Sequence, residues 1–354
     1  MIKSQQRIYA VLVPLLSVII ALLIAAVVIV LVGNDPLKAY WEMLKGAFGG
    51  AQEIANTVVK TTPLILTGLA VGFGFRAGVF NIGAEGQMAM GALFSTMVAM
   101  NLGSMPSVFA IPITLLVGMG VGAGWAAIAG ALKAFTGAHE VISTIMLNWI
   151  AYYLGNYMVA APLAVGSGTP KSPEIAPSAK LPPLLTVHAT ELTSGIIIAV
   201  IAAVVMYVIL EKTSVGYEVK AVGFNPYAAE YGGISIAKNV VLSMAISGAL
   251  AGLAGAVEAM GVHHRYLGAL TAGKGFDGIS VSLIGQNNPI GIIFAAFLIG
   301  SLRTGSNAMQ FLGVSKHVVM IVQGIVIFLV AAERIVRTIM IYLRFRRREA
   351  GMES

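Results

Sequence analysis

The chain has 354 residues, of which 58% are hydrophobic and 10% are charged. Soluble domains average about 25% charged residues, so this composition indicates a protein whose main solvent is lipid. The formal net charge of +7 does not indicate a nucleic-acid partner, because most of the excess flanks apolar runs and forms no basic face interleaved with aromatic residues. The chain has no cysteine, which excludes disulfides, thiolate metal ligands and a cysteine nucleophile.

The first apolar run extends from Ile8 to Val32 and follows Lys3 and Arg7. It is longer than the apolar part of a signal peptide and no small-residue cleavage site follows it, so we expect a retained helix. Four arginines lie between residues 344 and 348, near the other end of the chain. Because positive flanks favour the cytoplasmic side, we expect a multi-pass protein of the cell membrane with both termini in the cytoplasm.

Further apolar runs follow in chain order, and several approach the roughly 20 residues that cross the ~30 Å hydrocarbon layer. No segment shows the ten-residue alternation of a membrane β-barrel. We therefore expect an all-α polytopic fold, a single transmembrane domain over residues 1–354 with about 8–10 transmembrane helices, some of them broken. The runs are Val58–Phe75, Ile82–Leu102, Val108–Leu132, Val141–Ala161, Gly195–Leu210, Asn239–Val262, Pro289–Leu302 and Val318–Ala332.

Small residues four positions apart let helix backbones approach closely inside a membrane, where lipid supplies no hydrophobic driving force between helices. We expect such pairs to pack within this chain. The pairs are Gly68 and Gly72, Gly120 and Gly124, and Gly248 and Gly252.

Two glycine-rich stretches, Arg76 to Gly91 and Gly261 to Lys316, do not read as clean spans. Interrupted helices inside a membrane are tolerated only where they are buried or line a cavity, so both stretches are candidates for a translocation path. They also carry a faint repeat, Phe80-Asn-Ile-Gly83 and Phe276-Asp-Gly-Ile279.

Polar and aromatic residues in and near these stretches are candidates for contacts with a polar solute. The alternative is that Asn81, Glu85 and Asn148 cap broken helices or bridge neighbouring ones. Glu258 is the stronger candidate, because an ionisable group deep in an apolar run costs at least a few kcal/mol without a partner or a cavity. The full candidate set is Asn81, Glu85, Gln87, Asn148, Trp149, Glu258, Phe276 and Asp277.

Three chemical motifs fail on inspection, so we expect no metal and no cofactor. Residues Gly268 to Lys274 match the start of a P-loop, but Gly275 replaces the Ser or Thr that binds magnesium. His139-Glu140 could begin a zinc-binding HExxH motif, yet residue 143 is a serine. His263 and His264 are adjacent on the chain, so their side chains would not face one another on a helix.

Two polar loops separate apolar runs, at residues 162–194 and 211–238, and counting spans places the first outside the cell and the second inside. In the second loop Asn225 suits a helix N-cap, Pro226 the first helical position and Gly232 a C-terminal stop. The sequence thus predicts a helix over Pro226–Tyr231, too short to persist in water without a neighbour.

This loop resembles the coupling-helix region of ABC importer permeases of the ribose and branched-chain amino-acid type, and the resemblance covers nearly the whole chain. Three segments, Arg76–Gln87, His139–Asn148 and Gly275–Ser280, look most like the nucleoside-uptake branch.

The resemblance implies a non-enzymatic subunit that imports nucleosides by alternating access. It further implies a separate ABC ATPase subunit, a second related permease that forms a heterodimer with this chain, and an extracytoplasmic substrate-binding lipoprotein. Its implied ATPase-coupling residues are Asn225, Pro226, Tyr227, Ala228, Ala229, Glu230, Tyr231 and Gly232.

Alternatives remain open at this point. A simple sugar such as ribose is the second substrate class. An ion-driven secondary transporter would also use broken helices and acids such as Glu85 and Glu258. An intramembrane enzyme ranks last, because no nucleophile and base pair or metal cluster is evident.

Overall fold

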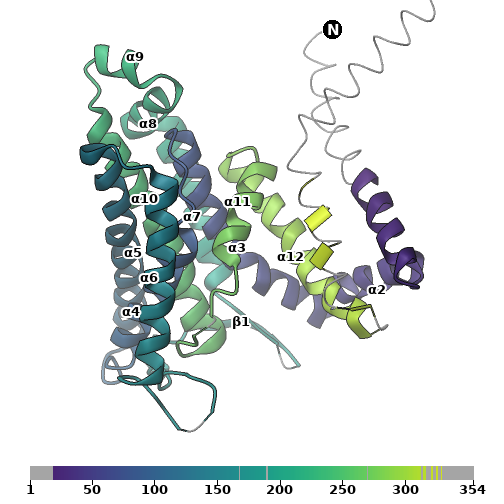
Figure 1. The fold of residues 1–354 in the computed structure, drawn as a ribbon. Coiled ribbons are helices and arrows are strands. Elements are labelled where there is room, and N and C mark those ends of the chain that lie inside the picture. Colours follow the sequence, from purple (N-terminus) through teal and green to yellow (C-terminus); the bar gives the residue numbers. More distant parts are fainter. Residues whose placement is uncertain are drawn as a thin grey trace, which may run out of the picture. The chain divides into compact units, whose positions relative to one another are not determined.

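The computed structural model describes residues 19–311 except 167, 189 and 269, together with 314–315, 320–321, 324–325 and 328. The described chain is mostly helical, which confirms the predicted fold class (Figure 1). The start of the first predicted helix, most of the run Val318–Ala332 and the arginine-rich tail lie outside the described residues.

The chain packs as two compact units. We call residues 51–301 the core bundle, and residues 1–50 with 302–354 the terminal unit. Within the terminal unit, helix Ile19–Leu31 meets α2 (Pro36–Phe48) at a bend of 118°. Asp35 caps α2 by accepting hydrogen bonds from the N–H groups of Leu37 and Lys38.

The core bundle contains most of the helices, and the last one continues into the terminal unit. Two helices end in π-helical turns, Leu132–Thr136 after α5 and Ala259–His263 after α10. The helices are α3 (Ala51–Arg76), α4 (Ala84–Ala99), α5 (Ser107–Ala131), α6 (Glu140–Ala160), α7 (Gly195–Lys212), α8 (Ser214–Phe224), α9 (Pro226–Tyr231), α10 (Ile236–Glu258), α11 (Lys274–Ile284) and α12 (Pro289–Phe311).

Five helices of the described chain are long and apolar enough to cross a membrane, and the bent pair in the terminal unit makes a sixth candidate. The five are α3, α5 with its π turn, α7, α10 with its π turn, and α12. By contrast α4 has only 16 residues and α11 only 11, so each is too short to cross alone. These two short helices are the broken segments that the glycine-rich stretches predict.

Glycines bring α4, α5 and α10 into direct backbone contact. A methyl group on Gly122 would overlap the carbonyl oxygen of Gly248 and lie 2.8 Å from the Cα of Gly252. One on Gly91 of α4 would overlap the backbone of Gly252, and one on Gly118 would lie 3.1 Å from the Gly252 carbonyl oxygen. The predicted role of Gly248 and Gly252 is therefore confirmed.

The prediction is wrong for Gly120 and Gly124, because a methyl group added to either would meet no atom of another described element within 4 Å. The packing pair on α5 is displaced by two positions, to Gly118 and Gly122, and a shift of two residues turns a helix face by about 200°. The remaining pair, Gly68 and Gly72 of α3, packs against α11 and α12 as expected.

The loop over residues 162–194 contains a two-stranded antiparallel hairpin that the sequence did not predict, β1 (Pro183–Val187) and β2 (Thr190–Thr193). The Thr190 hydroxyl donates to the side chain of Asn56, at the start of α3. At the other end of α3, Gly223 of α8 packs on the turn at Gly78. The hairpin and the α8–α9 segment therefore lie at opposite ends of the core bundle (Figure 1).

The glycine contact yields a matched test on one helix. We expect Gly122→Leu to destabilise the protein by about 1–3 kcal/mol or more, because the added side chain has no room against α10. Gly124→Leu should leave stability nearly unchanged, because its side chain would enter open space. Thermal unfolding of the purified protein in detergent measures both, and equal losses would contradict the packing of α5 on α10.

Candidate functional site

The site begins at the turn between α3 and α4, where the chain folds back inside the bundle. Gly78 takes a φ of 72°, a value that glycine adopts without strain. Arg76, the last residue of α3, donates through Nε to the carbonyl oxygen of Asn287 at 3.0 Å. The turn is thereby joined to the segment between α11 and α12.

A pair of buried amides holds the end of this turn. Asn81 and Gln87 exchange two side-chain hydrogen bonds, each 2.9 Å long. The Asn81 amide also donates to the Ser247 hydroxyl of α10 at 2.8 Å, and Ser247 donates to the carbonyl oxygen of Ala70 in α3. All polar atoms of the amide pair are thus directed at protein groups, as a water-excluded interior requires.

Asn148 of α6 bridges the first turn of α4. Its Oδ1 accepts from the N–H of Gly86 at 2.8 Å, and its Nδ2 donates to the carbonyl oxygen of Ile82 at 3.0 Å. A helix start leaves its first N–H groups without an intrahelical partner. Asn148 satisfies one of them from a neighbouring helix.

Glu85 connects α4 to the start of α11. Its two carboxylate oxygens accept from the N–H groups of Gly273 at 2.9 Å and Gly275 at 2.7 Å. The Thr67 hydroxyl, within α3, donates to the carbonyl oxygen of Lys274 at 3.1 Å. A carboxylate at a helix N-terminus complements the positive end of the helix dipole, so Glu85 is an N-terminal cap supplied from another helix.

The same position carries a buried ion pair. Lys274 Nζ lies 2.7 Å from Glu258 Oε1, and His263 Nε2 lies 3.4 Å from the same oxygen. Lys274 also donates to the carbonyl oxygen of Leu270 at 3.0 Å. The side chains of Glu258 and Lys274 are only 6% and 15% exposed. The pairing with Lys274 therefore explains how the buried acid is tolerated.

The predicted polar candidates are therefore grouped around the first turn of α4 and the start of α11. Asn148 contacts the first turn of α4, and Trp149 is the next residue of α6. Gly275 contacts Glu85 in the same turn, and Phe276 is the next residue of α11. Asp277 lies in the same first turn of α11. Trp149 is 50% and Phe276 46% exposed, whereas the amides are buried, so the two aromatic rings are the most exposed candidates, and the Trp149 ring stacks on Tyr153.

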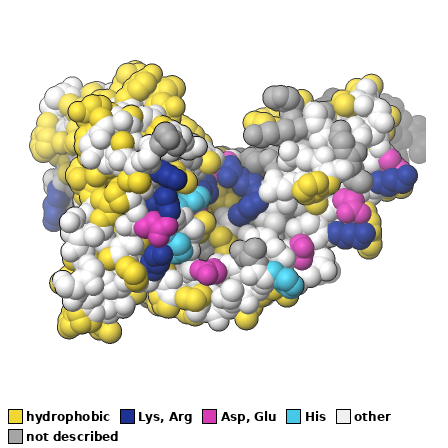
Figure 2. All heavy atoms as spheres, turned by 90° about the horizontal axis from the view of Figure 1, so that it is seen from below, with side chains coloured by type: hydrophobic (Ala, Val, Ile, Leu, Met, Phe, Trp, Pro, Cys, Tyr) yellow, Lys and Arg dark blue, Asp and Glu magenta, His cyan; other side chains and the backbone are white. Residues whose placement is uncertain are grey.

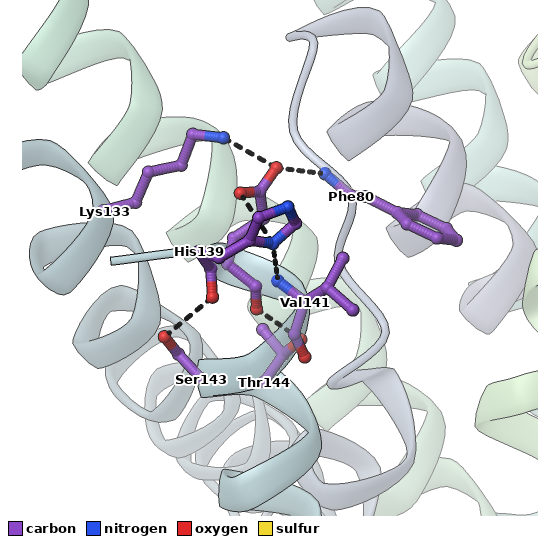
Figure 3. A network of polar contacts seen from close by, with 7 residues as sticks. Phe80, Lys133, His139, Val141, Ser143 and Thr144 are labelled. Carbon is purple, nitrogen blue, oxygen red and sulfur yellow. Dashed lines mark hydrogen bonds and ion pairs between the residues drawn. The ribbon is translucent and has the colours of Figure 1, made fainter. Parts of the chain in front are cut away.

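A second polar network, which the sequence did not predict, joins the turn between α3 and α4 to α6 and to the π turn after α5 (Figure 3). Lys133 Nζ lies 2.6 Å from Glu140 Oε1, and that oxygen also accepts from the N–H of Phe80 at 3.4 Å. His139 caps α6 by accepting from the Val141 N–H at 3.3 Å. In the sequence, the acid that follows His139 was the feature that could have indicated this ion pair.

At the hairpin end, charged side chains gather on the surface of the core bundle (Figure 2). Glu174 pairs with Lys180 at 3.6 Å and with Arg265. These two cations, Lys180 first, hold the pKa of the Glu174 carboxyl below its usual range. Backbone bonds from Ser172 to Tyr266 and from Ile175 to His264 fasten this loop to the segment after α10.

At the opposite end, α9 spans Pro226–Tyr231 as predicted. The side chain of Asn225 accepts from the Ala228 N–H at 3.1 Å, and Pro226 takes the first helical position. Gly232 ends the helix with φ −77°, and the left-handed conformation falls to Gly233 instead. Helix α8, which precedes α9 directly, was not predicted.

The surface of α9 is strongly aromatic. Tyr227 is 81% and Tyr231 97% exposed, while Ala229 is buried against the protein. Phe224, at the end of α8, is 86% exposed. Large aromatic side chains that stand free on one short helix are typical of an interface with another protein.

The sequence of the chain matches a known protein family. Residues 53–331 match the family model described as branched-chain amino acid transport system / permease component. The chain belongs to this permease family. It is a transmembrane ABC importer subunit without catalytic chemistry of its own, and a multi-pass membrane protein.

The permease is similar to curated relatives with different substrates in their names. The guanosine ABC transporter permease NupP of Bacillus subtilis is 40% identical, covering 95% of this chain and 97% of the relative. The glucose ABC transporter permease TsgB13 of Haloferax volcanii is 34% identical over 90% of this chain and 87% of the relative. The guanosine permease NupQ, also of B. subtilis, is 32% identical over 70% of this chain and 79% of the relative. No solved structure matches the chain.

The Glu258–Lys274 pair gives a testable energetic prediction. We expect Lys274→Met to destabilise the permease by about 3–5 kcal/mol, because it leaves a buried carboxylate without its lysine. The double variant Glu258→Gln with Lys274→Met should regain most of that loss. Lys220→Met, which breaks a more exposed pair with Glu211, is the control and should cost at most about 1 kcal/mol. Thermal unfolding would contradict the pairing if the double variant were no more stable than Lys274→Met.

Proposed function

We propose that this permease translocates nucleosides. The observation that carries the proposal is the similarity to a guanosine permease over nearly the full length of both chains. The glucose permease among the relatives keeps a simple sugar as the second candidate. An ion-driven mechanism is not retained, because the family couples transport to an ABC system.

We propose that the α8–α9 end faces the cytoplasm and the hairpin end faces outside, with both termini cytoplasmic. The arginines near the C-terminus and the lysine and arginine before the first helix support this orientation through the positive-inside rule. On this view residues 211–238 form a cytoplasmic coupling loop and residues 162–194 an extracytoplasmic loop.

The proposed substrate path passes the first turn of α4. Helices α4 and α11 both begin there and run to opposite ends of the bundle, since α4 ends near the loop at Ala176 and α11 ends near Arg76. Phe276 and Trp149 offer aromatic surface for a base, and Asp277 lies beside Phe276. The buried Asn81, Gln87, Asn148 and Glu258 and the partly buried Glu85 border the path and fix the shape of its wall.

The proposed docking site for the ATPase subunit is α9 with its caps, Asn225 to Gly232. The exposed Tyr227 and Tyr231 are its anchors, and the cap at Asn225 keeps a six-residue helix formed. Gly223 of α8 packs against the backbone of Arg76 and Gly78, so a displacement of α8–α9 reaches the turn that leads into α4. This contact supports alternating access driven from the α9 end.

Two further partners complete the proposed importer. A second permease forms a heterodimer with this chain, because the chain is similar to both NupP and NupQ of one bacterium. A substrate-binding lipoprotein docks at the hairpin end, where the charged loop around Glu174 provides polar contacts.

Uptake of labelled guanosine tests the substrate class, with the partner subunits present and excess uridine, glucose, ribose or leucine as competitors. We expect uridine to compete and the sugars and leucine not to compete. Competition by glucose or ribose alone would replace the nucleoside assignment with a sugar assignment and keep the permease function.

Substitution of the exposed tyrosines tests the docking site. We expect Tyr227→Ala with Tyr231→Ala to reduce co-purification of the ATPase and uptake about thirtyfold or more, because truncation of a hot-spot aromatic at an interface costs about 2 kcal/mol or more. Insertion into the membrane and thermal stability should be unchanged, because both side chains are almost fully exposed. Normal uptake by this variant would exclude α9 as the coupling element.

A further inference from the structure

The face of α8 and α9 that carries the proposed docking site also contains a cavity. Its volume is ≈ 570 Å³, within the range of about 300–1,000 Å³ found for pockets that hold a ligand. It is lined by residues of α8, of α9 and of the segment that leads to α10. Those used below are Tyr217, Glu218 and Phe224.

Glu218 gives the cavity its charge. Among the described residues that line the cavity, Glu218 alone carries a charged side chain. No lysine, arginine or histidine of the described chain lies within ion-pair distance of it, whereas the nearby Glu211 is paired with Lys220 at 3.0 Å. The cavity therefore presents one carboxylate that no described cation neutralises.

A hydrogen bond from α10 holds the Glu218 carboxylate in place. Glu218 Oε2 accepts a hydrogen bond of 3.1 Å from Nδ2 of Asn239, and Asn239 is buried at 1% exposure in the first turn of α10. Asn239 Nδ2 also donates to the carbonyl oxygen of Ser235 at 3.0 Å, while Oδ1 of the same amide has no hydrogen-bond partner among the described residues. A preorganised acceptor loses little conformational entropy when a partner binds, which favours a specific contact.

The walls of the cavity indicate which cation would fit. Tyr217 and Phe224 line the cavity and are 68% and 86% exposed, so aromatic surface stands beside the carboxylate. A guanidinium group can pair with a carboxylate and at the same time stack on aromatic faces, whereas a lysine ammonium is a compact, strongly hydrated point charge. The combination of acid and aromatic rings is complementary to arginine.

We propose that this cavity receives an arginine side chain of the ATPase subunit, inserted between Tyr217 and Phe224 and paired with Glu218. The inference rests on the proposed docking of the ATPase at α9 and extends that site to α8. It makes the contact reciprocal, because the tyrosines of α9 enter the ATPase while a basic side chain of the ATPase enters the permease. Because Asn239 in the first turn of α10 donates to Glu218, the arginine would also be linked to α10.

The test uses the complete importer and measures the affinity of the ATPase subunit for the permease pair at several salt concentrations. We expect Glu218→Gln, which keeps the acceptor for Asn239 and removes the charge, to weaken binding about tenfold or more and to reduce the salt dependence. Glu211→Gln is the matched control, because Glu211 already has a lysine partner in the chain, and its binding should stay within about twofold of the wild type.

A charge exchange identifies the partner residue. Glu218→Arg should abolish binding, and an Arg→Glu substitution at one position of the ATPase surface should restore it. If Glu218→Gln binds like the wild type while the Tyr227 and Tyr231 variant does not, the cavity proposal is wrong and the docking of α9 stands. If neither variant weakens binding, both are wrong. Loss of binding by Glu218→Gln that no ATPase arginine exchange repairs would also overturn the proposal.

Discussion

A helix that begins inside a membrane exposes N–H groups that water cannot satisfy, and the permease meets this constraint twice at the same position. Helices α4 and α11 both start within the bundle, and the Thr67 hydroxyl of α3 donates to the carbonyl oxygen of Lys274 at the start of α11. Glu85 and Asn148 supply the missing acceptors from neighbouring helices. Because each cap belongs to a different element, the two helix starts cannot move apart without leaving N–H groups unpaired.

Glycine contacts provide the rigid part against which these starts are held. At the close backbone approach of α4, α5 and α10, any side chain at Gly122 or Gly252 would overlap the backbone of the neighbouring helix. Helix α7 differs, because valine and isoleucine side chains cover its exposed surface and its glycine, Gly195, lies against side chains and not against the backbone of another helix. The bundle thus combines a closely packed core of helices with a peripheral apolar span, as expected when lipid provides no hydrophobic drive between helices.

The sequence was sufficient to predict the helical class, most spans, the broken segments and the short helix α9, because these depend on apolar length, glycine interruption and capping residues. The sequence did not predict which residues contact one another across the fold. Nothing in the sequence indicates that Glu85 would accept from Gly273 and Gly275, or that Lys274 would neutralise Glu258, because those residues lie far apart along the chain or belong to an irregular loop. The hairpin of residues 183–193 has too few residues for a periodic signal.

The choice between Gly120–Gly124 and Gly118–Gly122 illustrates a further limit. Both pairs have the same spacing on the same helix, and only the position of α10 decides which one is used. The candidate site shows the same dependence, since the sequence placed polar residues in the correct segments without distinguishing helix caps from surface available to a solute.

The π turns at the ends of α5 and α10 have a consequence for helical phase. Side chains three or four residues apart share a face of an α-helix, and those five apart do not. Glu258 and His263 are five apart, yet their side chains lie 3.4 Å apart, because the turn Ala259–His263 is wound more widely than an α-helix. The wider turn therefore returns His263 to the face of the acid, and an α-helical periodicity extended from α10 to His263 would assign this histidine to the wrong side.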